Sequence, residues 1–72
     1  MSVIEFLEQK EDAGLLRCSF AIYNNRDTRY AILYDNGFDV LFILPADNEI
    51  SEKNQQIIIE KVNNESIIKD MA

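Results

Sequence analysis

The chain is 72 residues long, carries a net charge of −6, and contains one cysteine and no histidine. That length allows a single domain with a thin core over residues 1–72, and the composition excludes an internal disulfide and the usual Cys/His zinc site. Because both ends of the chain are acidic and the middle is neutral, the sequence opposes direct nucleic-acid binding, which needs a basic stripe.

The first predicted element is a helix over residues 2–12. Ser2 and Glu5 match the capping box, in which the serine hydroxyl and the glutamate carboxylate accept hydrogen bonds from the first free amides of a helix. Apolar residues then recur at helical spacing. Gly14 follows at a position that suits the end of the helix.

From Leu15 the apolar residues alternate, and this period of two predicts three strands. The first strand ends before the turn formers Asn24–Asp27. The second is centred on Ile32, and the third begins at Phe38. Pro45 has no amide to donate to a ladder and therefore closes the third strand.

The turn Asp35–Gly37 is compatible with two registers. A two-residue loop places Tyr34 opposite Asp39. A three-residue loop, with Gly37 in the left-handed conformation, places Tyr34 opposite Phe38 instead. A one-residue slip moves every side chain of a strand to the other face, so the register is expected to be the one that buries the apolar side chains. We predict the three-residue loop, because it gathers the most apolar residues on one face.

A second helix is predicted over residues 51–63. Ser51 is placed as its N-cap, and Glu52 lies in the first turn, where the helix dipole favours an acid. The β-branched run Ile57–Ile59 leaves an isolated strand as the rival interpretation. Whether residues 64–72 continue the helix stays open at this stage.

These elements predict an α+β fold of order α-β-β-β-α. A three-stranded antiparallel meander carries an N-terminal and a C-terminal helix, and both helices lie mainly on one face of the sheet. The alternative places one helix on each face.

The first residues, Met1–Glu5, lack the positive n-region of a signal peptide. The longest apolar runs, such as Val40–Leu44, fall far short of the roughly 20 residues that a membrane span requires. A lone cysteine also fits a reducing compartment. We therefore expect a cytoplasmic protein with no membrane partner.

Residues for catalysis are scarce. Without histidine there is no familiar base for a serine or cysteine nucleophile, and Gly14 and Gly37 alone make no glycine-rich phosphate loop. Cys18 alternates with core residues and is interpreted as a buried structural thiol. The turns 35–39 and 47–49 lack the spacing of a calcium loop. The sequence thus predicts no enzyme, cofactor, metal or small-molecule substrate.

The predicted sheet has a second face that no helix is left to cover. In the chosen register the helices cover the side chains of Phe20, Ile22, Tyr30, Ile32, Tyr34, Phe38, Val40 and Phe42. A solvated face of an antiparallel sheet is usually polar, whereas the remaining face mixes apolar and aromatic side chains with arginines, as protein interfaces do. The predicted partner-binding residues are Leu15, Arg17, Tyr23, Arg29, Leu33, Leu41 and Ile43.

We therefore predict a small acidic protein that binds a partner protein, or a second copy of itself, through this face. Inhibitors, antitoxins, immunity proteins and phage-encoded modulators are often of this kind, so an inhibitor or regulator is the working hypothesis. The alternative is an acidic nucleic-acid mimic whose helices occupy a basic site on a partner. Lysines that interrupt the acids of both helices favour an ordinary solvated surface over a mimic.

Overall fold

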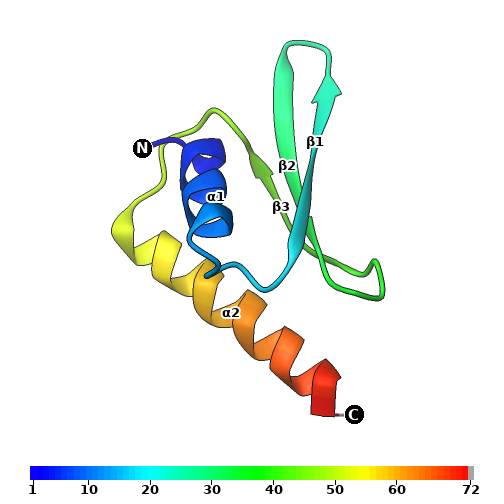
Figure 1. Cartoon of the computed structure of the whole chain (residues 1–72). Helices are drawn as coiled ribbons and strands as arrows, with labels where there is room; N and C mark the ends of the chain where they lie inside the picture. Colours follow the sequence, from blue (N-terminus) through cyan, green and yellow to red (C-terminus); the bar gives the residue numbers. More distant parts are fainter. Residues whose placement is uncertain (72) are drawn as a thin grey trace.

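Two helices and three antiparallel strands follow one another in the order predicted, and the α+β fold is confirmed (Figure 1). The computed structural model describes the backbone of residues 1–71 and the side chains of residues 1–64. The elements are α1 (Val3–Asp12), β1 (Ser19–Asn25), β2 (Thr28–Tyr34), β3 (Val40–Pro45) and α2 (Glu52–Met71).

The capping box at the start of α1 is present. The Glu5 amide donates to the Ser2 hydroxyl at 3.2 Å, and the Ser2 amide donates to the Glu5 carboxylate at 2.9 Å. The hydrogen bond from the Ser2 backbone, followed by that of its side chain, lowers the pKa of Glu5 below its ordinary value. These bonds satisfy two amides that helix geometry leaves unpaired, which explains why the helix begins here.

Helix α2 begins after Ser51, whose hydroxyl accepts from the Asn54 amide at 3.2 Å. The helix runs through Ile57–Ile59, so the rival strand is wrong, and it continues to Met71. Residues 64–71, which the sequence left open, therefore continue the helix. For residues 65–71 the backbone alone is described.

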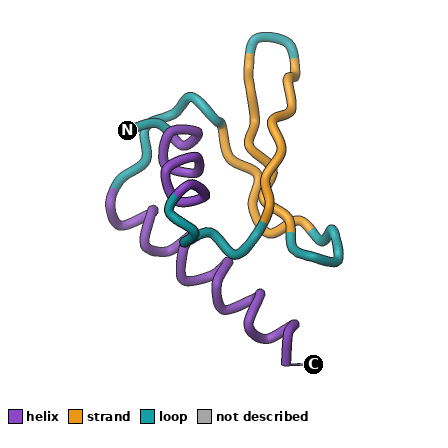
Figure 2. The backbone as a smooth tube through the Cα atoms, viewed as in Figure 1, coloured by secondary structure: helices purple, strands orange, loops and turns teal. Residues whose placement is uncertain are grey.

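Both helices pack on one face of a sheet of order β1-β2-β3 (Figure 2). Buried side chains from α1, β2, the segment before α2, and α2 itself form one core: Val3, Phe6, Leu7, Ala31, Leu33, Ala46, Ile50, Ile58 and Val62. Because a single cluster holds residues of both helices, the arrangement with one helix on each face is excluded.

The first hairpin fixes which face of each strand meets the helices. Arg26 and Asp27 form a two-residue loop, and Arg26 has a φ of 58°, as a tight hairpin turn of the primed type requires at this position. In the resulting register Ile22 pairs with Ala31 and Phe20 pairs with Leu33. Paired residues share a face. The predicted grouping of Phe20 and Ile22 with Tyr30, Ile32 and Tyr34 is therefore wrong.

The second turn also differs from the prediction. Tyr34 pairs with Val40, and the turn between them occupies residues 35–39. Phe38, with a φ of 63°, takes the left-handed conformation that was predicted for Gly37. The Asp35 carboxylate accepts from the amides of Gly37 at 2.8 Å and Asp39 at 3.0 Å, which explains how this turn is held.

A β-bulge in β3 shifts the alternation of its side chains. Leu33 pairs with Phe42 and Tyr34 with Val40, so Leu41 is an extra residue on β3. Both Leu41 and Phe42 pack against the core, while Val40 and Ile43 on either side of them are exposed. The bulge therefore turns two consecutive side chains toward the helices.

The segment after β3 is tied to the start of α1. The Val3 amide donates to the Asn48 carbonyl at 2.8 Å, and the Ile4 amide donates to the Ala46 carbonyl at 2.9 Å. These bonds hold α1 beside the end of β3.

Among residues 1–71, no helix combines the length and apolar character needed to cross a membrane.

Candidate protein-binding face

The face of the sheet turned away from the helices carries a continuous set of apolar and aromatic side chains. We call it the open face, and the pairing of the strands assigns to it Ser19, Ala21, Tyr23, Asn25, Thr28, Tyr30, Ile32, Tyr34, Val40, Ile43 and Pro45, with Phe38 beside Tyr34. None of these side chains is charged, although 28% of the residues in the chain are. A solvated sheet face would normally be polar.

Several large side chains of the open face are exposed, while Tyr30, Ile32 and Tyr34 are half-buried. Tyr23 is 55% exposed, Ile43 is 59% exposed and Phe38 is 80% exposed. Phe38 stacks on Tyr34 with ring centroids 5.9 Å apart. No hydrogen bond joins the hydroxyls of Tyr23, Tyr30 or Tyr34 to another described residue. The face thus offers flat apolar area together with three hydroxyls that can bond a partner.

Two of the predicted partner-binding residues lie on this face. Tyr23 is on β1 and Ile43 is on β3, and both are exposed. The placement of Leu33 there is wrong, because Leu33 is fully buried under the helices. The placement of Leu41 is also wrong, because the bulge turns its side chain toward the core.

Leu15 and Arg17 are exposed but do not belong to the sheet, which begins at Ser19. They lie in the segment between α1 and β1. The Asn63 side chain of α2 holds this segment, since its amide group accepts from the Arg17 backbone at 3.3 Å and donates to the Leu15 carbonyl at 3.4 Å. The predicted strand over residues 15–18 is therefore a connecting segment fixed against α2.

Arg29 lies on the helix side of β2, since it shares the parity of Ala31. The predicted register, with Tyr34 opposite Phe38, also places Arg29 opposite Ile43; this is wrong, because the structure pairs Ile43 with Ile32. The Arg29 guanidinium forms two hydrogen bonds with the Asp47 carboxylate and so raises its own pKa and lowers that of Asp47. Both groups are exposed, and the pair fixes the turn after β3.

Sequence reasoning placed Tyr30, Ile32, Tyr34, Phe38 and Val40 in the core, and the structure places them on the open face. A signal for the tyrosines was present, because a buried tyrosine hydroxyl needs a hydrogen-bond partner and a solvated face supplies one. The sequence held no comparable signal for Val40 and Phe38, since the five-residue turn and the bulge set their direction.

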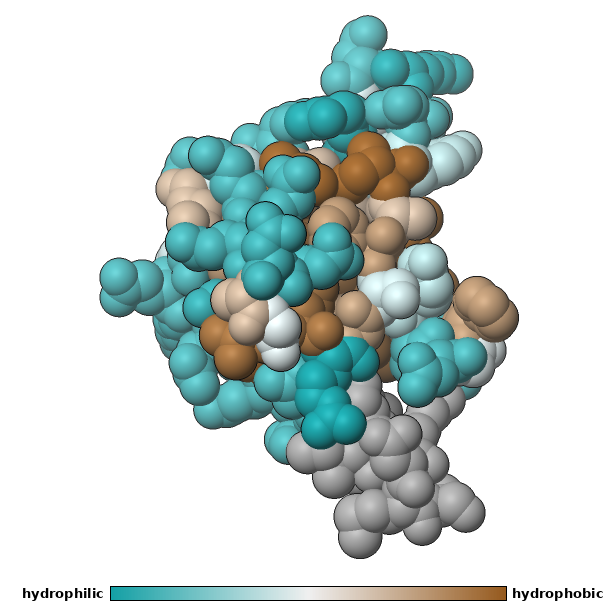
Figure 3. All heavy atoms as spheres, in the orientation of Figure 1, coloured by the Kyte–Doolittle hydropathy of each residue, from teal (hydrophilic) through white to brown (hydrophobic). Residues whose placement is uncertain are grey.

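Charge is concentrated away from the open face. Hydrophilic side chains cover the helical side of the molecule and the tip of the hairpin, while apolar side chains gather where the strands leave the helices (Figure 3). The exposed acids Glu8 and Glu11 belong to α1 and Glu60 belongs to α2. The open face and the acidic surface are thus separate regions that a partner would recognise by different forces.

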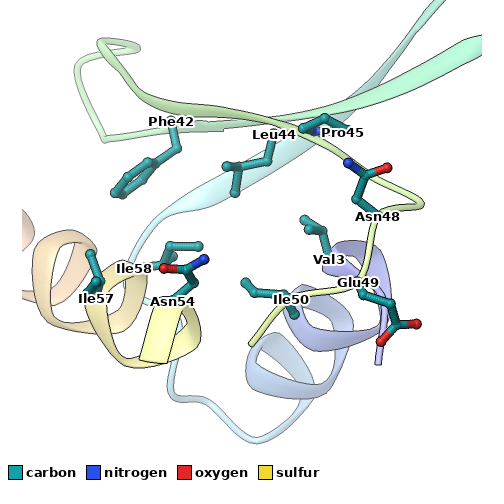
Figure 4. Close-up of a pocket in the computed structure, with 10 residues that line it drawn as sticks. All are labelled: Val3, Phe42, Leu44, Pro45, Asn48, Glu49, Ile50, Asn54, Ile57 and Ile58. Atoms are coloured by element: carbon teal, nitrogen blue, oxygen red, sulfur yellow. The ribbon is translucent and has the colours of Figure 1, made fainter. Parts of the chain in front are cut away.

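A pocket of about 340 Å³ lies on the helix side, between β3 and the first turns of α2 (Figure 4). Its wall is mostly apolar and includes Phe42, Leu44 and Ile58. Glu49 is the one carboxylate among its lining residues, and its oxygen accepts from the Met1 amino group at 2.7 Å. The pocket can bury an apolar group, but it presents no pair of titratable groups for acid–base chemistry.

Cys18 packs against the core at the entry to β1. Burial raises the pKa of its thiol to about 11, and the negative charge of Glu11 adds to the effect. The thiolate, and not the protonated thiol, is the nucleophile.

We expect iodoacetamide at pH 8 to alkylate Cys18 in the native protein on the order of a hundredfold more slowly than in the protein unfolded in urea. Mass spectrometry of quenched samples measures both rates, and equal rates would contradict the raised pKa of this half-buried thiol.

In the described part of the chain, no three histidine, cysteine, aspartate or glutamate side chains come close enough to hold a metal ion. The arrangement of the open face supports recognition of another surface by apolar burial and hydroxyl hydrogen bonds.

Comparisons with known protein families, with curated proteins and with solved structures give no match to this chain.

Proposed function

We propose that this chain is a small acidic binding protein of the cytoplasm whose open face docks onto another protein and so inhibits or regulates it. The observation that supports the proposal is the uncharged face of aromatic and β-branched side chains on a chain in which 28% of the residues are charged. Tyrosine and phenylalanine are enriched at the centres of protein interfaces, and charged residues are depleted there.

The partner proposed for this face is a different and larger protein. Three strands of about seven residues cover a footprint on the order of 300 Å², from the usual spacing and rise of strands. A specific interface buries roughly 800 Å² on each side. A second copy stacked face to face would fall well short of that area. A larger partner can extend past the flat sheet to Phe38 and the projecting hairpin.

The chemistry of the face also defines the partner's surface. The contact region should be apolar at its centre, to cover Val40 and Ile43, and should carry carbonyl or carboxylate acceptors for the tyrosine hydroxyls. It has no need of a basic groove, because no acid lies on the open face.

Parallel affinity captures from the native cell test the proposal with three baits: the wild-type chain, Ile43→Asp and the double variant Glu8→Gln/Glu60→Gln. A protein that binds the open face should be retained by the wild type and by the double variant. It should be lost with Ile43→Asp, because a carboxylate in an apolar interface is left unpaired. Retention by all three baits would contradict the proposal.

The salt dependence of the affinity distinguishes this function from that of an acidic mimic. Docking through the open face should change less than about threefold in affinity between low and physiological ionic strength, because the face is uncharged. A mimic seated in a basic groove should weaken more than about tenfold, because exposed charges are screened beyond about 8 Å. Calorimetry on the captured protein measures this. A steep salt dependence, or loss of binding in the double variant, would favour the mimic.

A further inference from the structure

The pocket on the helix side of the sheet has walls that hydrogen bonds hold in place. These walls come from α1, β3, the segment 48–50 and the first turns of α2. The segment is tied to α1, because the Val3 amide donates to the Asn48 carbonyl at 2.8 Å. It is tied to α2 as well, because the Gln55 side chain donates to the Ile50 carbonyl at 3.3 Å. The pocket is thus formed before anything binds, as is usual for ligand sites.

The interior of the pocket is apolar, and it lies on the opposite side of β3 from the open face. Phe42 and Leu44 point from β3 toward the helices, and Ile58 of α2 lies across the space from them (Figure 4). Ile43, between the two strand residues, belongs to the open face. A ligand in the pocket leaves the open face accessible, so this site does not depend on the function proposed above.

The volume of the pocket sets the size of its ligand. A cavity of about 150 Å³ lined by aliphatic and aromatic side chains accommodates benzene. At about 340 Å³ this pocket has roughly twice that room, which corresponds to two fused rings. Phe42 offers an aromatic ring for such a ligand to contact. The Lys61 ammonium of α2 lies 5.2 Å from the centroid of this ring and helps to position it.

The charges around the pocket select an uncharged ligand. None of the described residues that line it is a lysine or an arginine, so a carboxylate or phosphate would lose hydration without gaining a partner. Glu49 is the one acid of the lining, and its carboxylate points away from the interior (Figure 4).

Hydrogen-bonding groups are available at the mouth of the pocket. The side chains of Asn48 and Asn54 line it and are exposed. Within the described part of the chain, no hydrogen bond engages either side-chain amide. An amide both donates and accepts, so these groups can bond an N–H or a hydroxyl of the ligand.

The surroundings of the mouth favour a free small molecule over a side chain of a partner protein. Asp47 and Lys53, which are next to Asn48 and Asn54 in the chain, are charged and exposed, and Glu49 is exposed as well. The centre of a protein interface is depleted of charged residues. A partner that covered this rim would remove those charges from water, whereas a small molecule leaves them hydrated.

We propose that the pocket between β3 and α2 binds an uncharged small molecule the size of two fused rings, with one hydrogen-bonding group directed to the mouth. Such a ligand contacts the sheet and both helices together. Because it binds the folded chain and not the unfolded one, it should also raise the temperature of unfolding.

Titration with indole, which has two fused rings and one N–H donor, tests the proposal by nuclear magnetic resonance. The amides of β3 and of the first turns of α2 should shift and saturate with a dissociation constant on the order of 1 mM, as expected for so small a ligand. Nuclear Overhauser effects should join the indole ring protons to the methyl groups of Ile50 and Ile58. Indoleacetate, which adds a carboxylate to the same rings, should bind at least about tenfold more weakly.

Two tryptophan variants distinguish the pocket from the open face. Ile57 lines the pocket and is 47% exposed, so Ile57→Trp should leave the fold intact by circular dichroism while its ring occupies the pocket. The affinity for indole should then fall at least about tenfold, because the bulky side chain excludes the ligand. Ile43→Trp makes the same change on the open face, where Ile43 is 59% exposed, and should keep the affinity within about twofold of the wild type.

Several results would overturn the proposal. One is the absence of a saturable shift, and another is Overhauser contact of indole with the methyl groups of Val40 and Ile43 on the open face. An unchanged affinity in Ile57→Trp, or equal affinities for indole and indoleacetate, would also contradict it. Tighter binding of N-acetyltryptophanamide than of indole would assign the pocket to a tryptophan side chain of a partner protein instead.

Discussion

Leu33→Asp is expected to unfold the protein, whereas Ile43→Asp should leave its far-ultraviolet circular dichroism unchanged. Leu33 is fully buried beneath both helices, and an aspartate there has no partner among the surrounding apolar side chains. The cost of several kcal/mol is comparable to the roughly 4–11 kcal/mol of stability that a domain of this size has. Ile43 is 59% exposed, and its replacement should cost less than about 0.5 kcal/mol.

Leu33→Ala gives a graded measurement at the same site. Urea unfolding should show a loss of about 3 kcal/mol, from the lost burial of the side chain and the cavity that it leaves. A folded Leu33→Asp chain with normal thermal unfolding would show that this face of β2 is solvated, and it would overturn the assignment of both sheet faces.

The two residues were predicted to share one face, and the error has a specific physical source. Alternation in β2 gives two apolar sets, one of tyrosines and Ile32 and the other of Ala31 and Leu33, and size alone favours the first set for the core. The loop of the first hairpin decides otherwise. A loop of even length pairs residues of opposite parity, so Phe20 and Ile22 must share their face with Leu33 and Ala31. The sequence contains this information in the length of the turn.

The bulge at Leu41 could not be predicted in the same way. It depends on how the five-residue turn fits between β2 and β3, and several nearly equivalent turns are compatible with Asp35–Asp39. Tertiary packing selects the one that turns both Leu41 and Phe42 into the core. Val40 consequently faces solvent, although strict alternation would place it with Phe42.

The helix starts were predictable because their signals are local. Ser2 with Glu5, and Ser51 with the amide of Asn54, satisfy the free amides of a helix within one turn, and no distant residue alters that requirement. Whether α2 ends at Asn63 could not be decided from the sequence. That residue's side chain is engaged with the backbone of Leu15 and Arg17 and does not end the helix.

Phe38→Gly is expected to weaken binding of the captured protein about 30-fold or more, with less than about 1 kcal/mol change in the free energy of unfolding. An aromatic side chain that a partner covers at an interface commonly contributes about 2 kcal/mol or more to binding. Phe38 is 80% exposed and extends the open face beyond Tyr34. Its left-handed backbone costs about 1–2 kcal/mol, which glycine relieves. That gain offsets the roughly 1 kcal/mol lost with the stacking on Tyr34.

Phe38→Ala is the matched control, because it removes the ring and keeps the backbone penalty. It should lose binding to the same extent as Phe38→Gly. Its free energy of unfolding should be lower by about 1 kcal/mol, so it should unfold at a lower urea concentration. Titration calorimetry with the captured protein and urea unfolding of each variant measure the two effects separately. Binding by Phe38→Gly at wild-type strength would show that the ring makes no contact with the partner. Equal stability of the two variants would instead show that the left-handed conformation at this position carries no strain.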